Sequence, residues 1–147
     1  MNTVPVNKKI LLCSVAGVLA ALTLSIRPVR SQAAPRVIEV LADRDSRFKI
    51  AGQKQPPEIT AKPGEELTLR ITAVKAKNHN RDGSVHGFAL LRVSDRQLVP
   101  GWDLLLKPGE QEFHLTAPNR VGDYIVICTV VCSQSHEEMT IKFVVEP

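Results

Sequence analysis

From Pro35 onward, the sequence consists of short runs of β-branched, leucine and aromatic residues separated by turns that contain proline or glycine. The clearest run alternates Leu67, Leu69 and Ile71 with polar residues, which is the pattern of a strand with one buried face. Similar runs recur at a spacing of roughly 8–12 residues, which is typical of an all-β sandwich. The expected strands cover residues 37–41, 48–50, 59–61, 67–72, 88–93, 112–115, 124–127 and 140–145.

The segments between these runs carry turn chemistry. Lys62-Pro63-Gly64-Glu65 and Lys107-Pro108-Gly109-Glu110 each place proline second and glycine third, as β-turns prefer. Residues 75–84 are polar and predict an exposed loop. A domain over residues 35–147 is long enough to bury about two-thirds of its unfolded surface, so it needs no disulfide to fold.

Residues 1–34 have the pattern of an export segment. Two lysines precede a charge-free run over residues 10–26, and Ser31-Gln32-Ala33 offers small residues for signal-peptidase cleavage. A retained membrane anchor is an equally good interpretation, because residues 10–26 match the short end of the ~17–25 residues that a spanning helix needs. Both interpretations deliver residues 35–147 to an extracytoplasmic, periplasmic space, either secreted or anchored by residues 10–26.

The net charge of +4 does not describe this domain. Four of the 19 Lys and Arg residues lie in the first 30 positions, which leaves 15 against 15 Asp and Glu residues in the remainder. A near-neutral domain has no basic stripe to follow a phosphate backbone, so we expect no nucleic-acid partner. The sequence also lacks a nucleophile–base pair, a phosphate-binding glycine loop and a Cys-x2-Cys-His haem attachment motif, so no catalysis is expected from this chain alone.

The chemistry is concentrated near the C-terminus. Cys128, Cys132, His136 and Met139 follow the spacing Cys-x3-Cys-x3-His-x2-Met. Thiolate and thioether ligands together favour copper over zinc, magnesium or calcium. Two cysteines four residues apart in one loop can turn both sulfurs to the same side and bridge two metal ions. Such a site needs a second imidazole, and His86 is the best candidate.

These motifs, in their order along the chain, resemble a known family. Val85-His86-Gly87-Phe88, Gly122-Asp123-Tyr124 and the Cys/His/Met cluster are similar to the binuclear copper (CuA) domain of cytochrome c oxidase subunit II, and to that of nitrous-oxide reductase. The resemblance extends from about residue 37 to residue 147. It implies a cupredoxin-like Greek-key sandwich or barrel, which would follow the one N-terminal signal or anchor helix expected from residues 1–34.

The resemblance also implies a ligand set and a function. Cys128 and Cys132 would bridge two copper ions, His86 and His136 would each bind one copper, Met139 would be a weak ligand, and the backbone carbonyl of Val130 would be another. The family passes single electrons from cytochrome c or a similar donor to a haem partner. We therefore expect copper as the cofactor and, as one candidate partner, subunit I of a haem-copper oxidase, for which this chain would receive the electrons.

Two other interpretations stay open. The same ligands suit a periplasmic copper-binding or copper-delivery protein. Alternatively, Cys128 and Cys132 could form a structural disulfide, which leaves the spacing of His136 and Met139 unexplained. Copper uptake by the chain, and the spectrum of the copper-loaded chain, distinguish the electron carrier, the copper-binding or delivery protein and the structural disulfide.

The surrounding residues carry weaker expectations. Gly87 would allow close packing around a metal, and Ser133 and Ser135 are candidate hydrogen-bond donors to the cysteine sulfurs. His79 and His114 are expected to face solvent, and Trp102 to serve in packing. Glu137-Glu138 is expected to be a solvated pair, which could also attract a basic cytochrome.

Overall fold

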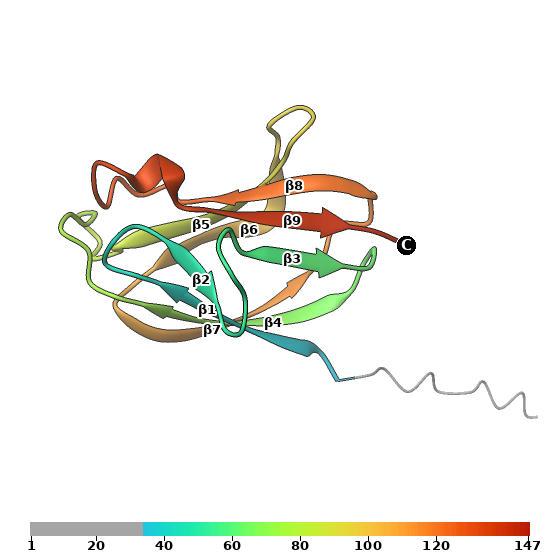
Figure 1. Ribbon diagram of the computed structural model, residues 1–147, viewed down its shortest axis with the longest axis horizontal. Coiled ribbons are helices and arrows are strands. Elements are labelled where there is room, and N and C mark those ends of the chain that lie inside the picture. Colours follow the sequence, from blue (N-terminus) through green and yellow to red (C-terminus); the bar gives the residue numbers. More distant parts are fainter. Residues whose placement is uncertain (1–33) are drawn as a thin grey trace, which may run out of the picture. The chain divides into compact units, whose positions relative to one another are not determined.

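In the computed structural model, which describes residues 34–147, the chain forms two facing sheets (Figure 1). One sheet has the order β2-β1-β4-β7, and its strands are β1 (Arg36–Ala42), β2 (Phe48–Ile50), β4 (Glu66–Ala73) and β7 (Gly109–Thr116). The other has the order β3-β9-β8-β5-β6, and its strands are β3 (Glu58–Ala61), β5 (His86–Arg92), β6 (Leu98–Leu106), β8 (Gly122–Ile127) and β9 (Thr140–Val145). The described part of the chain is thus an all-β sandwich, as the sequence predicts.

The core lies between the two sheets. Leu67, Leu69 and Ile71 all point inward from β4, as their alternation predicts. Aromatic side chains fill much of the space: the Trp102 and Phe143 rings meet edge to face with centroids 5.3 Å apart, and Phe48 and Phe88 do the same at 5.2 Å, in arrangements that aromatic pairs prefer. Burial of these side chains removes a large apolar area from water, which is the main force that holds the two sheets together.

Each strand expected from the sequence is present, and one further strand appears. β6 is not expected because Pro100 and Gly101 interrupt any alternation in this segment. It is an edge strand, where proline is tolerated because one row of its backbone groups faces away from the sheet. A shift in register between Ala89 and Leu91 of β5 accommodates it.

The first Lys-Pro-Gly-Glu segment forms the turn that its sequence predicts. Gly64 has a φ of 69°, and the backbone N–H of Glu65 donates to the Lys62 carbonyl. In the second such segment, Gly109 and Glu110 already belong to β7. The loop over residues 75–84 is mostly exposed, as expected.

Three loops meet at one end of the sandwich, seen at the left of Figure 1. β1 and β4 run parallel and end together, with Ala42 paired to Ala73, so the β1–β2 and β4–β5 loops leave the same sheet side by side. β5 begins where the antiparallel β8 ends, and the β8–β9 loop follows at once. This topology brings His86, Cys128 and the β1–β2 loop to one place.

The expected export or anchor segment over residues 1–34 lies, apart from Ala34, outside the described residues. Among residues 34–147, no helix has the length and apolar character that crossing a membrane requires. The short 3-10 helix η1 (His136–Glu138) is the one helical element in this range.

Candidate metal centre

Three of the side chains predicted as ligands form a compact buried group. A ring nitrogen of His86 and the sulfurs of Cys128 and Cys132 all lie within 4.8 Å of one another. The three residues belong to different parts of the fold, because His86 opens β5 and the cysteines lie in the β8–β9 loop. A rigid sheet therefore presents the imidazole to the loop that carries the thiols.

The imidazole of His86 has one nitrogen bonded and one free. Its Nε2 lies 3.1 Å from the carbonyl oxygen of Val74, to which it donates, while Nδ1 is buried with no hydrogen-bond partner among the described residues. A bond of this kind fixes the tautomer and leaves the lone pair of the other nitrogen for a metal. Burial lowers the pKa of His86, although the Val74 carbonyl and the charge of Asp43 oppose that effect. The neutral, ligating form is therefore favoured.

Cys128 and Cys132 are free thiols, with their sulfurs 3.8 Å apart. The distance is well beyond the ~2.05 Å of a disulfide bond. Burial raises the pKa of the Cys128 thiol to about 11, with a smaller contribution from the neighbouring Cys132, while the Gly87 N–H opposes the increase. Without a metal, Cys128 is thus held as a neutral thiol that faces the sulfur of Cys132.

The carbonyl of Val130 points toward both cysteines. It accepts a hydrogen bond from the Cys128 thiol at 3.2 Å and another from the backbone N–H of Cys132 at 2.7 Å. Met139 is fully buried at the base of the loop, where its carbonyl accepts a hydrogen bond from the Cys128 N–H. The backbone carbonyls of both residues are therefore hydrogen-bonded to the cysteines, that of Val130 to a thiol and that of Met139 to a backbone N–H.

His136 stands apart from the three-residue group. It opens η1 and is partly exposed, and it is not among the residues whose ligand atoms lie within 4.8 Å of one another. Its Nδ1 is nevertheless buried and has no hydrogen-bond partner within the described residues. Two imidazole nitrogens at this end of the sandwich are thus unpaired, an arrangement that costs free energy unless another group binds them.

Gly87 allows the β8–β9 loop to approach the backbone of β5 closely. A Cβ atom at this position would lie 2.0 Å from Oγ1 of Thr129 and 2.7 Å from its backbone nitrogen. The β8–β9 loop therefore packs directly on the backbone of β5, and the Gly87 N–H lies 3.4 Å from the Cys128 sulfur. No other residue type fits here without moving the loop.

The sequence does not reveal the residue that contacts the second sulfur. The hydroxyl oxygen of Ser46, in the β1–β2 loop, lies 3.5 Å from the sulfur of Cys132 and also contacts the hydroxyl of Ser133. Within residues 34–147, neither Ser133 nor Ser135 bonds a cysteine sulfur directly. Ser133 contacts the sulfur's partner Ser46, and Ser135 donates its backbone N–H to the Ser133 hydroxyl. Ser46 is separated from Cys132 by 86 positions, and nothing local in the sequence signals the contact.

The other singled-out residues lie where they were expected. His79 and His114 are exposed, and Glu137 and Glu138 are exposed on η1. Trp102 is buried, and its ring N–H donates to the carbonyl of Thr116 at 2.9 Å.

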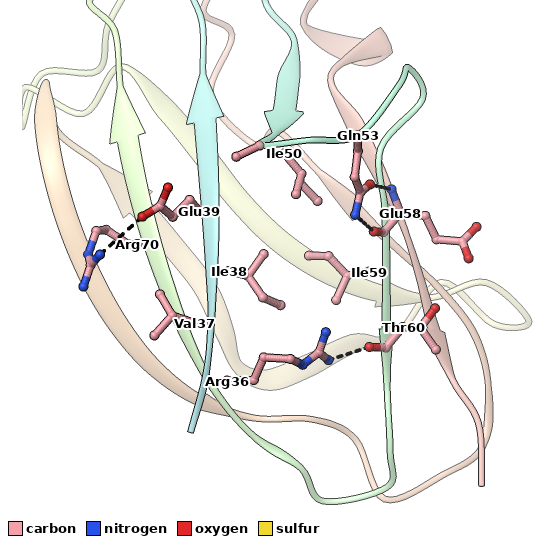
Figure 2. A pocket seen from close by; sticks show the side chains of 11 residues that line it. Arg36, Val37, Ile38, Glu39, Ile50, Gln53, Glu58, Ile59, Thr60 and Arg70 are labelled. Carbon is pink, nitrogen blue, oxygen red and sulfur yellow. Dashed lines mark hydrogen bonds and ion pairs between the residues drawn. The ribbon is translucent and has the colours of Figure 1, made fainter. Parts of the chain in front are cut away.

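A separate hollow of about 760 Å³ opens between the first half of β1 and β3 (Figure 2). Ile38, Ile50 and Ile59 point into it, and Arg36 bridges its lower end by donating to the Thr60 carbonyl. None of the predicted metal ligands lines this hollow, so it is distinct from the thiol group.

The donor set suits copper. Two thiols, an unpaired imidazole nitrogen and a buried thioether are soft or borderline ligands, and the site is shielded from water. The residues present therefore fit the cofactor that the sequence resemblance implies.

Comparison with known proteins supports the fold. No protein-family model and no curated protein sequence matches this chain. Among solved structures, it is similar to auracyanin A, a "blue" copper protein from the green thermophilic photosynthetic bacterium Chloroflexus aurantiacus, with a TM-score of 0.50 and 21% identity over 76% of this chain and 99% of that chain. The described residues therefore have the cupredoxin fold that the family resemblance implies.

Two further structures are similar. Auracyanin B matches with a TM-score of 0.49 and 19% identity, over 79% of this chain and 93% of that chain. A chain of a heme-copper terminal oxidase dimer matches with a TM-score of 0.48 and 17% identity, over 77% of this chain and 66% of that chain. The matched region thus spans about two-thirds of the length of the oxidase chain.

Proposed function

We propose that this chain binds two copper ions in a binuclear CuA centre and transfers single electrons through it. The observation that carries the proposal is the buried group of His86, Cys128 and Cys132, with their ligand atoms within 4.8 Å and the Nδ1 of His86 unpaired. A disulfide does not need the unpaired imidazole nitrogen that lies within 4.8 Å of the sulfurs. The spacing of the cysteines, histidine and methionine is similar to that of the CuA family, and this similarity is the reason for proposing two copper ions rather than one.

In this proposal each ligand keeps the role that the resemblance implies. Cys128 and Cys132 would hold both metals, His86 and His136 would each bind one, and Met139 and the Val130 carbonyl would be the weaker ligands. Bound copper would accept and release one electron at a time. The protein's part is to hold the donors in place, since an electron-transfer site works best when its ligands rearrange little.

Several features of the chain support such rigidity. The Val74 carbonyl fixes the ring of His86, and the bond between the Cys128 N–H and the Met139 carbonyl continues the β8–β9 ladder into the loop. The Asn78 N–H donates to the Cys132 carbonyl at 3.1 Å and ties the β4–β5 loop to the same site. The buried setting also keeps water from the sulfurs, which raises the influence of nearby dipoles on the metal.

We further propose an extracytoplasmic location and an electron donor such as a cytochrome c, with a haem-copper oxidase as the acceptor. The export-like segment at residues 1–34 supports the location. Val131, next to Cys132, is 62% exposed and offers an apolar contact close to the metal site. The exposed Glu137 and Glu138 add negative charge near it, which would steer a basic partner toward the loop.

Copper titration of the full-length chain tests the function. We expect two copper ions per chain, a purple colour, and an EPR signal from one electron shared by two coppers. Cys128→Ser should abolish this spectrum because it removes one bridge. His114→Ala should leave it unchanged, because His114 is exposed on β7 and contacts Thr68 rather than the thiols. One copper per chain with a single-copper EPR pattern would refute the binuclear centre.

One observation favours a second candidate, Cu(I) delivery. The compact group contains three donors and leaves out His136, and a set of two thiols and one imidazole is sufficient for a single soft Cu(I) ion. A delivery protein would hold one Cu(I) that exchanges readily with a competing chelator. It would show no mixed-valence EPR signal, so the same titration separates the two functions.

A further inference from the structure

Among the described residues, the hydroxyl of Ser46 is the one side-chain group outside the metal-binding loop that lies at hydrogen-bond distance from the Cys132 sulfur. Resting on the copper function proposed above, we propose that Ser46 is a positioning residue whose hydroxyl donates a hydrogen bond to the thiolate of Cys132 and so sets the spectrum and reduction potential of the copper centre. The family resemblance does not identify this position, because the resemblance is carried by residues elsewhere in the chain.

The backbone around Ser46 is built to present this hydroxyl. Ser46 is 1% exposed and has a φ of 58°, a left-handed conformation that serine seldom adopts. Asp43 holds the turn, because its carboxylate accepts a hydrogen bond from the Arg47 N–H at 2.9 Å and its own N–H donates to the Arg47 carbonyl. Lys49 pairs with the same carboxylate. The unusual conformation is therefore maintained by several contacts, as is common where a loop residue has a functional role.

The hydrogen bonds around Ser46 have one consistent direction when Cys132 is a thiolate. A thiolate has no hydrogen, so the Ser46 hydroxyl must donate to it. The Ser133 hydroxyl then donates to the Ser46 oxygen, and the Ser135 N–H donates to the Ser133 oxygen at 3.1 Å. Each donor in this series polarises the next, which strengthens the final bond to the sulfur.

The hydroxyl would affect the metal through the sulfur. A hydrogen bond to a thiolate stabilises its negative charge and reduces the electron density it gives to copper. The net charge of the reduced centre is one unit more negative than that of the oxidised centre. The positive end of the O–H dipole therefore stabilises the reduced form more. We therefore expect Ser46 to raise the reduction potential.

Ser46→Gly is the appropriate test variant. Glycine adopts a φ of 58° without strain, so the variant removes the hydroxyl while it relieves the backbone. In the one-electron reduction, an electrode supplies the electron and no bond to Cys132 is broken. We expect the equilibrium constant for one-electron reduction of the copper-loaded variant to fall about tenfold, which equals a fall of about 59 mV in reduction potential. The thiolate-to-copper absorption should also shift.

Two neighbouring serines provide matched controls. Ser133→Ala removes the donor to Ser46 but leaves the bond to sulfur, so its shift in potential should have the same sign and a smaller size. Ser135→Ala should cause no shift, because Ser135 contributes its backbone N–H to the series. An equal potential and spectrum in Ser46→Gly and the wild-type chain would overturn the proposal.

A readout without metal separates this proposal from the function. In the copper-free chain, infrared spectroscopy reports the S–H stretch of each cysteine, and Cys132→Ser identifies the band of Cys132. Ser46→Gly should shift that band because the sulfur loses its hydroxyl contact, and an unchanged band would overturn the role of Ser46. Failure of the wild-type chain to form a CuA spectrum would instead refute the binuclear function.

Discussion

At the scale of single residues, the proposed centre depends on a position without a side chain and on a buried nitrogen without a hydrogen-bond partner. Gly87 has no side chain because Thr129 occupies the space beside it, and Nδ1 of His86 has no partner although it is buried. Any side chain at position 87 would displace the β8–β9 loop, whereas pairing Nδ1 of His86 would stabilise the fold. A metal bound at this nitrogen would account for its lack of a hydrogen-bond partner.

Gly87→Ala should destabilise the chain and impair copper binding. The new Cβ cannot coexist with Oγ1 of Thr129 at 2.0 Å, so the β8–β9 loop must move away from β5. We expect a cost of about 1–3 kcal/mol, as is usual for overpacking, measured by urea unfolding. Thr129→Ala in the same chain should restore only part of the loss, because the backbone nitrogen of Thr129 remains 2.7 Å away. Full stability in the Gly87→Ala chain would contradict this packing.

The thiol of Cys128 makes the copper-free protein sensitive to alkali. Burial raises its pKa to about 11 from an ordinary 9.0, so between these values the unfolded chain has released a proton that the folded chain retains. The contribution of Cys128 to stability is therefore complete below pH 9 and is lost as the pH rises toward 11. Urea midpoints between pH 8 and 10.5 should fall more steeply for the wild-type chain than for Cys128→Ser. If the urea midpoints of the two chains fall equally with pH, the pKa of the Cys128 thiol is not raised by folding.

At the scale of elements, the sequence predicts strands where the alternation is local and fails where the neighbours decide. β4 is recognised because its own residues alternate, and the Lys62–Glu65 turn because proline and glycine are the residues it requires. β6 escapes recognition because Pro100 and Gly101 are tolerated only at a sheet edge. The parallel pairing of β1 with β4 is equally invisible, because it joins residues far apart in the chain.

Trp102 links the edge strand β6 to the rest of the sandwich. Its ring packs on Phe143, and its N–H donates to the Thr116 carbonyl in the opposite sheet. Trp102→Phe removes that bond and part of the ring, so we expect a loss of about 2 kcal/mol in the free energy of unfolding. The copper spectrum should not change, because Trp102 packs far from the cysteines. Its neighbour Phe143 is paired with Tyr124 near the start of β8, whereas Cys128 follows the end of that strand. A changed spectrum would give Trp102 a role in the metal centre.

The β1–β2 turn should respond to Asp43 as a unit. Asp43→Ala removes the acceptor of the Arg47 N–H, so the turn loosens and Ser46 loses its place beside Cys132. We expect a loss of about 1–2 kcal/mol in stability. Asp43→Asn removes the same negative charge near His86 but keeps an acceptor oxygen, so the reduction potential of Asp43→Ala should lie below that of Asp43→Asn. Equal potentials in the two variants would show that the turn does not control the position of Ser46.

At the scale of the whole molecule, the site is assembled from parts that the sequence shows and parts that it does not. The cysteines, His136 and Met139 lie within twelve positions, so their spacing alone predicts a metal loop. His86 is found because it belongs to the segment Val85-His86-Gly87-Phe88, which resembles the CuA family. Val74, Thr129 and Ser46 are missed because their contributions come from a carbonyl, a packing contact and a distant loop. Such contacts depend on topology, which a local pattern does not encode.

The topology also makes a prediction about stability. The donors of the centre come from β5 and from the β8–β9 loop, so they gather only in the folded chain. Copper should therefore bind the folded state in preference to the unfolded one and stabilise it, by about 2.7 kcal/mol when free copper is a hundredfold above its Kd. For a domain of this size the gain corresponds to a rise of roughly 10 °C in the melting temperature.

Calorimetry of the full chain under anaerobic conditions, with copper and after its removal by a chelator, measures this stabilisation. Cys132→Ser should lose most of the rise because it removes a bridging donor, while His114→Ala should retain it, since His114 lies exposed on β7. Both copper functions predict the rise, but the binuclear centre requires two copper ions per chain to reach it, whereas Cu(I) delivery requires one. A melting temperature that copper does not alter would mean that the buried His86, Cys128 and Cys132 group is structural, and that the unpaired Nδ1 of His86 is a cost the fold carries without a metal.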